Sequence, residues 1–168
     1  MAVIAPLSGA QLRADPELGD SLLALNNAHA RELSWLEPER LTDLVDMAFA
    51  ARHVGTAEAL LLAFDQNAAY DSANFLWLRE RYDRFVYIDR VVVAASARGR
   101  GLASALYADL IDAARAAGHQ RLVCEINADP PNPASDAFHA RLGFATIGTA
   151  QLSDGKTVRY CGRDLSTT

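Results

Sequence analysis

Residues 98–103, Arg-Gly-Arg-Gly-Leu-Ala, place two arginines and two glycines where an apolar, β-branched run over 86–93 gives way to a helical pattern. A strand that ends at a glycine-rich turn and restarts as a helix leaves several backbone N–H groups unpaired and directed at one point. Such a point binds anions, and phosphate is the usual ligand. Because cations at a helix N-terminus oppose the helix dipole, a bound anion would explain both Arg98 and Arg100. No acidic residue stands close to them in the sequence.

The elements that must position this turn are predicted by apolar periodicity and turn residues. Strands are expected at 3–7, 51–56, 58–65, 85–94, 121–126, 144–152 and 157–165. Helices are expected at 18–33, 38–49, 101–117 and 132–142, with a short helix near 74–81. Asn132 before Pro133 is a typical helix start. We therefore expect one α/β domain over residues 1–168, with a mixed sheet and helices on both faces.

Two segments carry a family resemblance. The spacing R-x-x-G-x-A occurs at 98–103, and residues 132–144, N-P-A-S-D-A-F-H-A-R-L-G-F, resemble the segment N-x-x-A-x-x-(L/F)-Y-x-x-x-G-F. With the order of elements, these motifs make the whole chain resemble the GNAT superfamily of acyl-CoA-dependent N-acetyltransferases. The resemblance implies a mostly antiparallel central sheet that splays at the CoA site. It also implies direct transfer of an acetyl group from acetyl-CoA to a primary amine of a small molecule or peptide, in a ternary complex.

The resemblance also implies which residues would bind the acetyl-CoA cosubstrate. Val91, Val92 and Val93 would lie beside the pantetheine arm, and Asn132 would reach it with its side-chain amide. A backbone N–H near Val92 or Val93 would polarise the thioester carbonyl, since the developing oxyanion needs a fixed donor. The pyrophosphate would be cradled by the backbone amides of Arg98, Gly99, Arg100, Gly101, Leu102, Ala103 and Ser104.

Two residues are candidates for the proton transfers. Asp89 stands in the otherwise apolar strand over 85–94, and strand alternation places it on the face of Tyr87, Val91 and Val93. It is the candidate base, although it could also be a structural carboxylate paired with a neighbouring arginine. His139 occupies the position where the family usually has a tyrosine that protonates the thiolate. It could take over that role, or the role could fall to Tyr87, Tyr160 or water. His139 could also be a helix histidine that only packs and hydrogen-bonds.

Two alternative functions fit part of the sequence. Residues 99–104 nearly match the dinucleotide-binding pattern G-x-G-x-x-G, which would indicate an oxidoreductase. However, Ser104 replaces the third glycine, and too few residues follow Glu125 to form a second nucleotide-binding half. The other alternative is a non-catalytic acyl-CoA sensor on the same fold, which would bind CoA without turnover.

Composition limits the partners and the compartment. The chain has 168 residues, 51% hydrophobic, with a formal net charge of −5, which argues against nucleic-acid binding. No signal peptide and no apolar run of membrane-spanning length is evident, so we expect a cytoplasmic protein without a membrane partner. No metal is expected, because no Cys/His cluster has metal-site spacing. Cys124 and Cys161 are expected to be buried thiols, neither placed to carry an acyl group. A homodimer is also expected.

Overall fold

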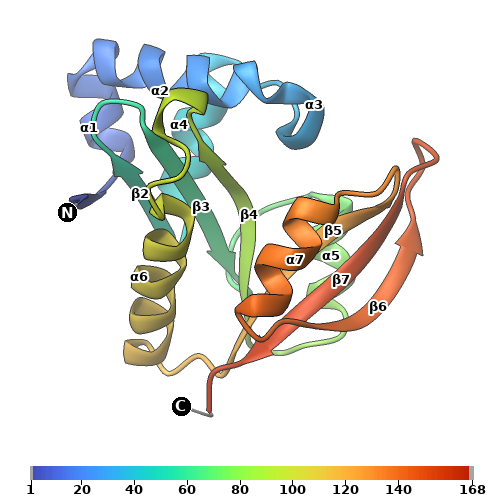
Figure 1. Ribbon diagram of the computed structural model, residues 1–168. Helices are drawn as coiled ribbons and strands as arrows, with labels where there is room; N and C mark the ends of the chain where they lie inside the picture. Colours follow the sequence, from blue (N-terminus) through green and yellow to red (C-terminus); the bar gives the residue numbers. More distant parts are fainter. Residues whose placement is uncertain (1, 167–168) are drawn as a thin grey trace.

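The sheet has seven strands in the spatial order β1-β2-β3-β4-β5-β7-β6 (Figure 1). All neighbouring strands are antiparallel except β4 and β5, which are parallel. The computed structural model describes residues 2–166. The strands are β1 (Ile4–Pro6), β2 (Ala50–Val54), β3 (Ala59–Asp65), β4 (Val86–Val93), β5 (Arg121–Asp129), β6 (Ala145–Gln151) and β7 (Thr157–Asp164). The mixed, mostly antiparallel sheet predicted from the sequence is confirmed.

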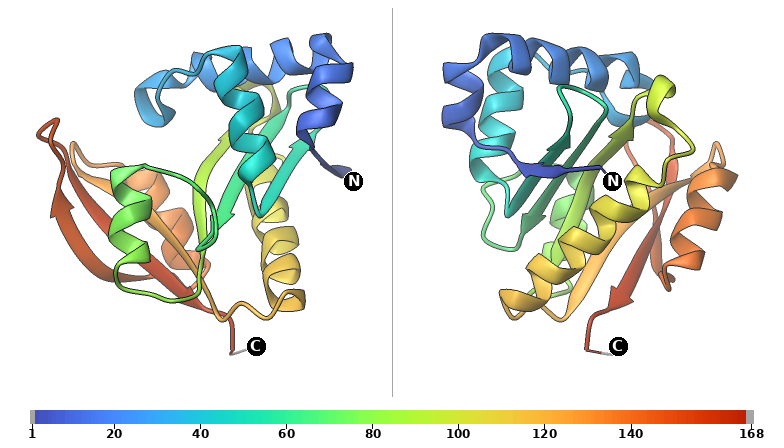
Figure 2. Two further views of the ribbon diagram at one scale, coloured as in Figure 1. Left: turned by 180° about the vertical axis from the view of Figure 1, so that it is seen from behind. Right: turned by 60° about the vertical axis from the view of Figure 1, so that its left-hand side comes forward.

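Helices cover both faces of the sheet, as predicted. Figure 2 shows α4 and α5 on one face, and α6 and α7 lie on the other face in Figure 1. The helices are α1 (Gly9–Ala14), α2 (Pro16–Ala28), α3 (Ala30–Leu33), α4 (Pro38–Met47), α5 (Ala73–Arg79), α6 (Leu102–Ala116) and α7 (Pro133–Arg141), with a 3-10 turn, η1 (Ala95–Ala97), before α6. In the described part of the chain, no helix is long and apolar enough to cross a bilayer.

The N-terminal helices differ from the sequence prediction. One helix was expected over 18–33, but α2 ends at Ala28 and α3 is a separate single turn. Asn27 explains the break, because its side chain bonds the backbone N–H and C=O of Leu36 and turns the chain back. The helix α1 was not predicted. It is short, and a capping box between Ser8 and Gln11 defines its start.

Two apolar clusters hold the layers together, one on each face of the sheet. Leu60, Leu62 and Phe64 of β3 point to the cluster that contains α2, α4 and α5. Leu61 and Ala63 point to the cluster that contains α6. All five side chains are fully buried, as expected for a central strand covered on both faces. The strand β3 therefore alternates regularly along its whole length.

The neighbouring strand β4 does not alternate regularly. Tyr87 and Val92 pack into the α2–α4–α5 cluster, while Ile88 and Val91 belong to the α6 side. The register explains the change, because Arg90 pairs with Leu62 and Ile88 pairs with Ala63, leaving Asp89 as an extra residue. Such a β-bulge reverses the faces on its far side. The prediction that Asp89 shares a face with Tyr87, Val91 and Val93 is therefore wrong for both valines.

The strands β4 and β5 separate almost as soon as they meet. They pair only at Val86–Leu122 and Tyr87–Val123, after which no further pairing occurs. The C-terminal half of β4 keeps its partner β3 on one side and has none on the other. The strand β5 instead continues alongside β7 as far as Asp129, three residues beyond its predicted end. The splayed sheet implied by the family resemblance is thus present.

Candidate active site

An elongated groove follows the free edge of β4. It encloses about 410 Å³ and runs between β4 and α7, with α3 above it and the start of α6 at one end. The residues predicted to bind the cosubstrate gather here. The groove is lined by His29, Glu32, Leu33, Val91, Val92, Val93, Arg98, Ala103, Asn132, Ala134, Ser135, Phe138 and His139.

The end of the groove at α6 has the geometry of an anion site. Gly99 and Gly101 have φ angles of 78° and 74°, and a Cβ built on either would meet nothing within 4 Å. Gly101 is the N-cap of α6 and provides no side-chain cap, so the first N–H groups of the helix are free to bind a ligand. A small hollow lined by Gly99, Gly101, Leu102, Ala103 and Ser104 lies over them.

The two arginines of the turn point in different directions. Arg98 lines the groove, with its Nη2 atom 3.4 Å from Nε2 of His29. Arg100 turns away and forms an ion pair with Glu58, with Nη1 and Oε1 3.0 Å apart. No acid is close to the arginines in the sequence, but the fold brings Glu58 to Arg100.

The free edge of β4 supplies unpaired backbone donors to the groove. The N–H of Ala94 bonds to the carbonyl of Glu58, on the side of β3. Because alternate residues of a strand direct their N–H groups to the same side, Val92 also faces β3, and the N–H groups of Val91 and Val93 face the gap. Of the two oxyanion donors considered from the sequence, Val93 has the right orientation.

On the opposite wall, Asn132 caps α7 as predicted. Its Oδ1 accepts the N–H of Ser135 at 3.3 Å, with Pro133 at the first helical position. The residue nevertheless lines the groove. Its side-chain NH₂ group is not used by the cap, so Asn132 can cap the helix and bind a ligand together.

A second cavity, of about 220 Å³, opens on the other face of the sheet. It is lined mainly by polar side chains, which include Arg31, Glu32, Tyr70, Asn74, Tyr87, Asp89, Arg90, Glu125, Asn127, Asp154 and Lys156. Tyr70 lines this cavity, whereas Phe75 of α5 is buried in the core.

The Asp89 carboxyl lies in this second cavity and is only 7% exposed. Tyr70 donates a hydrogen bond to Oδ1 at 3.0 Å, and Arg90 Nε donates to Oδ2 at 3.1 Å. Burial raises the pKa of Asp89, whereas Arg90 and the tyrosine donors oppose that rise. Asp89 is thus paired with an arginine, as the structural alternative predicted. Its carboxyl also lines a cavity, which a catalytic base requires.

Glu125, on β5, is a second buried carboxyl that the sequence analysis did not assign to the site. It lines the same cavity as Tyr87 and Asn74, and its Oε2 atom is buried without a partner in residues 2–166. Burial raises its pKa to about 8, and the nearby Asp89 charge adds to the rise. The sequence signal was a lone acid in the apolar strand 121–126.

His139 is held by two hydrogen bonds. Its Nδ1 lies 2.8 Å from the carbonyl oxygen of Ser135, and a carbonyl can only accept, so Nδ1 carries the proton. Its Nε2 therefore accepts the Tyr107 hydroxyl, also at 2.8 Å. Burial lowers the pKa of His139 and favours this neutral form. In this state Nε2 of His139 carries no proton and cannot act as a proton donor. The Tyr107 hydroxyl, which donates to Nε2, belongs to a side chain that lines the gap between β4 and β5.

The two cavities meet where β4 and β5 separate. A hollow of about 160 Å³ in this gap shares Asp89 and Glu125 with the polar cavity, and Val91 and His139 with the groove. Cys124 also lines this hollow. Burial raises the pKa of the Cys124 thiol, so the nucleophilic thiolate is disfavoured. Cys124 and Cys161 are both buried and free, as predicted.

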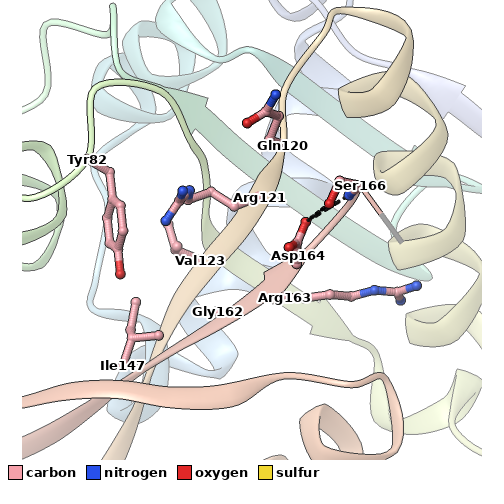
Figure 3. A pocket seen from close by; sticks show the side chains of 9 residues that line it. All are labelled: Tyr82, Gln120, Arg121, Val123, Ile147, Gly162, Arg163, Asp164 and Ser166. Atoms are coloured by element: carbon pink, nitrogen blue, oxygen red, sulfur yellow. Dashed lines mark hydrogen bonds between the residues drawn. The ribbon is translucent and has the colours of Figure 1, made fainter. Parts of the chain in front are cut away.

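A further pocket, of about 270 Å³, lies elsewhere, beside the last residues of β7 (Figure 3). Arg121 reaches toward Tyr82 and lies over its ring, and Asp164 is hydrogen-bonded to Ser166. None of the predicted site residues lines this pocket. Among the described residues, no group of three or more His, Cys, Asp or Glu side chains could hold a metal ion.

The comparison with protein families agrees with this geometry. A family model described as the Acetyltransferase (GNAT) family matches residues 23–144. The chain belongs to the GNAT family. Because this is a family of acetyltransferases, the match counts against the dinucleotide-binding oxidoreductase. The antiparallel pairing of β4 with β3 is likewise unlike the parallel sheet of a dinucleotide fold.

Individual relatives of this GNAT protein support the assignment. Over 70 residues it is 44% identical to phosphinothricin N-acetyltransferase from Streptomyces coelicolor, a match that spans 42% of this chain and only 40% of that protein. The fold resembles the ribosomal-protein-S18-alanine N-acetyltransferase of Escherichia coli, with TM-score 0.70, 16% identity and coverage of 100% and 96% of the two chains. It also resembles Arabidopsis thaliana NAA60 in complex with acetyl-CoA, with TM-score 0.68, 14% identity and coverage of 98% and 99%.

The raised pKa of Glu125 predicts that folding stability decreases as pH rises. Between its ordinary value of 4.5 and about 8, the folded protein keeps a proton that the unfolded chain has released. The free energy of unfolding should therefore fall by about 1.4 kcal/mol for each pH unit in this window. Urea unfolding of the wild type and Glu125→Gln from pH 5 to 8 would measure the difference in slope.

The glutamine variant should lose this part of the pH dependence. His119 and His139, whose pKa values are lowered by burial, titrate in the opposite sense below about pH 6.5. They are present in both proteins, so their contribution cancels in the comparison. Equal slopes for the two proteins would show that Glu125 does not bind a proton on folding.

Proposed function

We propose that this GNAT enzyme transfers an acetyl group from acetyl-CoA to a primary amine of a small molecule or peptide. The transfer is direct, in a ternary complex. The observation that carries the proposal is the junction of two cavities in the gap between β4 and β5. The groove, which has the anion site, shares Val91 and His139 with the gap. The polar cavity, which has the buried carboxyls, shares Asp89 and Glu125 with it.

The groove is suited to the acetyl-CoA substrate. Pyrophosphate would lie on the amides from Arg98 to Ser104, where two positive-φ glycines keep the backbone accessible. The pantetheine arm would lie along Val91, Val92 and Val93 and pair with the free edge of β4, and Asn132 would hold it from the opposite wall. The free N–H of Val91, which lines the gap, would then face the thioester oxygen and stabilise the oxyanion, while that of Val93 would pair with the pantetheine arm farther along the groove.

The polar cavity is suited to the amine. The acceptor nitrogen attacks the thioester carbon, the C–S bond breaks, and an amide and a thiolate result. An ammonium ion is not nucleophilic, so it must first lose a proton, and we assign this step to Asp89. The carboxyl of Glu125, predominantly protonated at neutral pH, lies beside it and completes the polar surround of the nitrogen.

The departing sulfur requires a proton or a hydrogen-bond donor. We assign this role to Tyr107 together with His139. The Tyr107 hydroxyl, which donates to Nε2 of His139 in this structure, lines the gap and would turn to donate its hydrogen bond to the thiolate sulfur. Covalent catalysis by Cys124 has no support, because burial keeps its thiol protonated.

We specify the acceptor only as a primary amine. The relative from Streptomyces coelicolor is named for phosphinothricin, so amino-acid-like amines are among the acceptors to test. Polyamines, aminoglycoside-like amines and peptide N-termini complete the range. A homodimer, a cytoplasmic location and the lack of nucleic-acid or membrane partners remain predictions from the sequence.

The deciding experiment measures thiol release from acetyl-CoA across a panel of these amines, with a blank that lacks amine. Release above the blank with one class of amine, together with mass-spectrometric detection of the N-acetyl product, would establish the activity and the acceptor class. If the protein binds acetyl-CoA but no amine of the panel gives thiol release above the blank, transfer to a small amine or short peptide would be contradicted.

Arg98→Ala should weaken acetyl-CoA binding about tenfold, because a charge-assisted phosphate contact of about 1.4 kcal/mol is lost. Arg100→Ala is the matched control, since that side chain pairs with Glu58 outside the groove and should leave affinity within about twofold. Calorimetry gives both affinities. An equal loss in the two variants would mean that the turn binds through its net charge and not through Arg98.

Asp89→Asn should lower kcat at least about a hundredfold at neutral pH, because an amide cannot accept the proton of the amine. Acetyl-CoA affinity should stay close to that of the wild type, since Asp89 lies outside the CoA groove. Asp109→Asn is the control, because its carboxylate pairs with Arg52 away from the cavities. A variant with unchanged turnover and an unchanged pH profile would exclude Asp89 as the base.

A further inference from the structure

We propose that Arg90 is a positioning residue that joins the roof of the acceptor cavity to the Asp89 carboxylate, so that both are placed as one unit. The roof is defined here as α3 together with Ser34, residues 30–34. The role given to Asp89 rests on the proposed function, whereas the joint itself is a feature of the structure and can be tested without turnover.

The β-bulge at Asp89 makes the joint possible. In a regular strand, consecutive side chains point to opposite faces and cannot form an ion pair. Here the extra residue in β4 lets Asp89 and Arg90 reach the same side, with Nε and Oδ2 3.1 Å apart. Both side chains are nearly excluded from water, at 7% and 6% exposure. The pair is therefore weakly screened and holds the carboxylate firmly.

The rest of the guanidinium is bound to the roof and to α2. Nη1 donates to the carbonyls of Leu33 and Ser34 at 2.7 and 3.3 Å, and to Oδ1 of Asn26 at 2.9 Å. Nη2 donates to the hydroxyl of Ser34 at 3.3 Å. A planar fork with donors on three nitrogens can satisfy these partners and Asp89 together. A lysine would keep the charge but could not span both ends.

The roof needs such a tie because its backbone is strained. Ser34 has a φ of 70°, a conformation that non-glycine residues adopt only when their surroundings enforce it. Besides Arg90, Asn26 Nδ2 donates to the Ser34 carbonyl at 3.1 Å. The roof matters for the reaction site, because Glu32 and Leu33 line the groove, the gap and the polar cavity alike.

Other charged and titratable groups face Asp89 from every side of the cavity and belong to its pH response. They are Arg31 and Glu32 of the roof, Tyr70 before α5, Tyr87 and Arg90 of β4, Glu125 of β5, Asp154 and Lys156 between β6 and β7, and, across the gap, Tyr107 of α6, Cys124 of β5 and His139 of α7. Of these, Arg90 provides the largest opposition to the effect of burial on the pKa of Asp89. Loosening Arg90 should therefore raise that pKa.

Arg90→Lys tests the joint at both ends. We expect the KM for the amine to rise about tenfold, because the roof loses its tie. We also expect the acid limb of the kcat/KM profile to move upward by about one pH unit, because Asp89 loses its fixed partner. The KM for acetyl-CoA should change less than about twofold, since the anion site at α6 lies apart from Arg90. Arg52→Lys, at the Arg52–Asp109 pair, is the matched control and should change none of these quantities.

Asn26→Ala separates the two ends. It removes one bond to the roof, one to Arg90 and one to Asn27 but leaves the Arg90–Asp89 pair in place. We expect a higher KM for the amine without a shift of the acid limb. A shift as large as that of Arg90→Lys would overturn the proposal, because the roof alone would then control Asp89.

Hydrogen exchange supplies a readout that needs no substrate. The amides of residues 30–34 should exchange at least about tenfold faster in Arg90→Lys and in Asn26→Ala than in the wild type or Arg52→Lys. If Arg90→Lys does not fold, Asn26→Ala carries the test. Faster exchange without any turnover of the wild type would uphold the joint and contradict the proposed function. Unchanged exchange would overturn the joint whatever the activity.

Discussion

The active-site geometry of this GNAT protein depends on the early end of pairing between β4 and β5. Two parallel pairs hold the strands together, and beyond Tyr87 the edge of β4 is left with unpaired N–H groups in the interior of the protein. Buried donors without partners are costly, so this edge is stable where water or a ligand can satisfy it. The same separation creates the gap that joins the two cavities. Backbone pairing, site access and oxyanion stabilisation thus have one structural origin.

A second constraint follows from burying carboxyls at this gap. Asp89 is tolerated because Arg90 and Tyr70 compensate its charge, whereas Glu125 keeps its proton up to about pH 8. Two neighbouring carboxyls in different protonation states can bind and deprotonate an amine near neutral pH. Tyr87 of β4, and Tyr70 and Asn74 of the segment around α5, line the same cavity as these carboxyls, on the far side of the sheet from α6 and α7.

Much of the fold, and much of the groove proposed to bind acetyl-CoA, could be predicted from the sequence. Glycines with positive φ, an N-cap asparagine followed by proline, and β-branched runs are local signals, and each was found where the sequence placed it. Errors arose where a distant residue decided the outcome. Asn27 ends α2 by bonding to Leu36, and Glu58 takes the side chain of Arg100 away from the anion site. The bulge at Asp89 broke the alternation on which its predicted face relied.

The sequence by itself determined the family, the order of elements and the anion-binding turn, because these depend on residue types at short, fixed spacings. Only the tertiary structure decided the rest. It showed that Glu125 stands beside Asp89, that Tyr107 hydrogen-bonds Nε2 of His139, and that Arg90 ties the roof to the carboxylate. These contacts join residues on separate strands and helices. The β-bulge at Asp89 decides which side chains of β4 face these partners. Periodicity along the chain does not encode such insertions, since they are set by the register with the neighbouring strand.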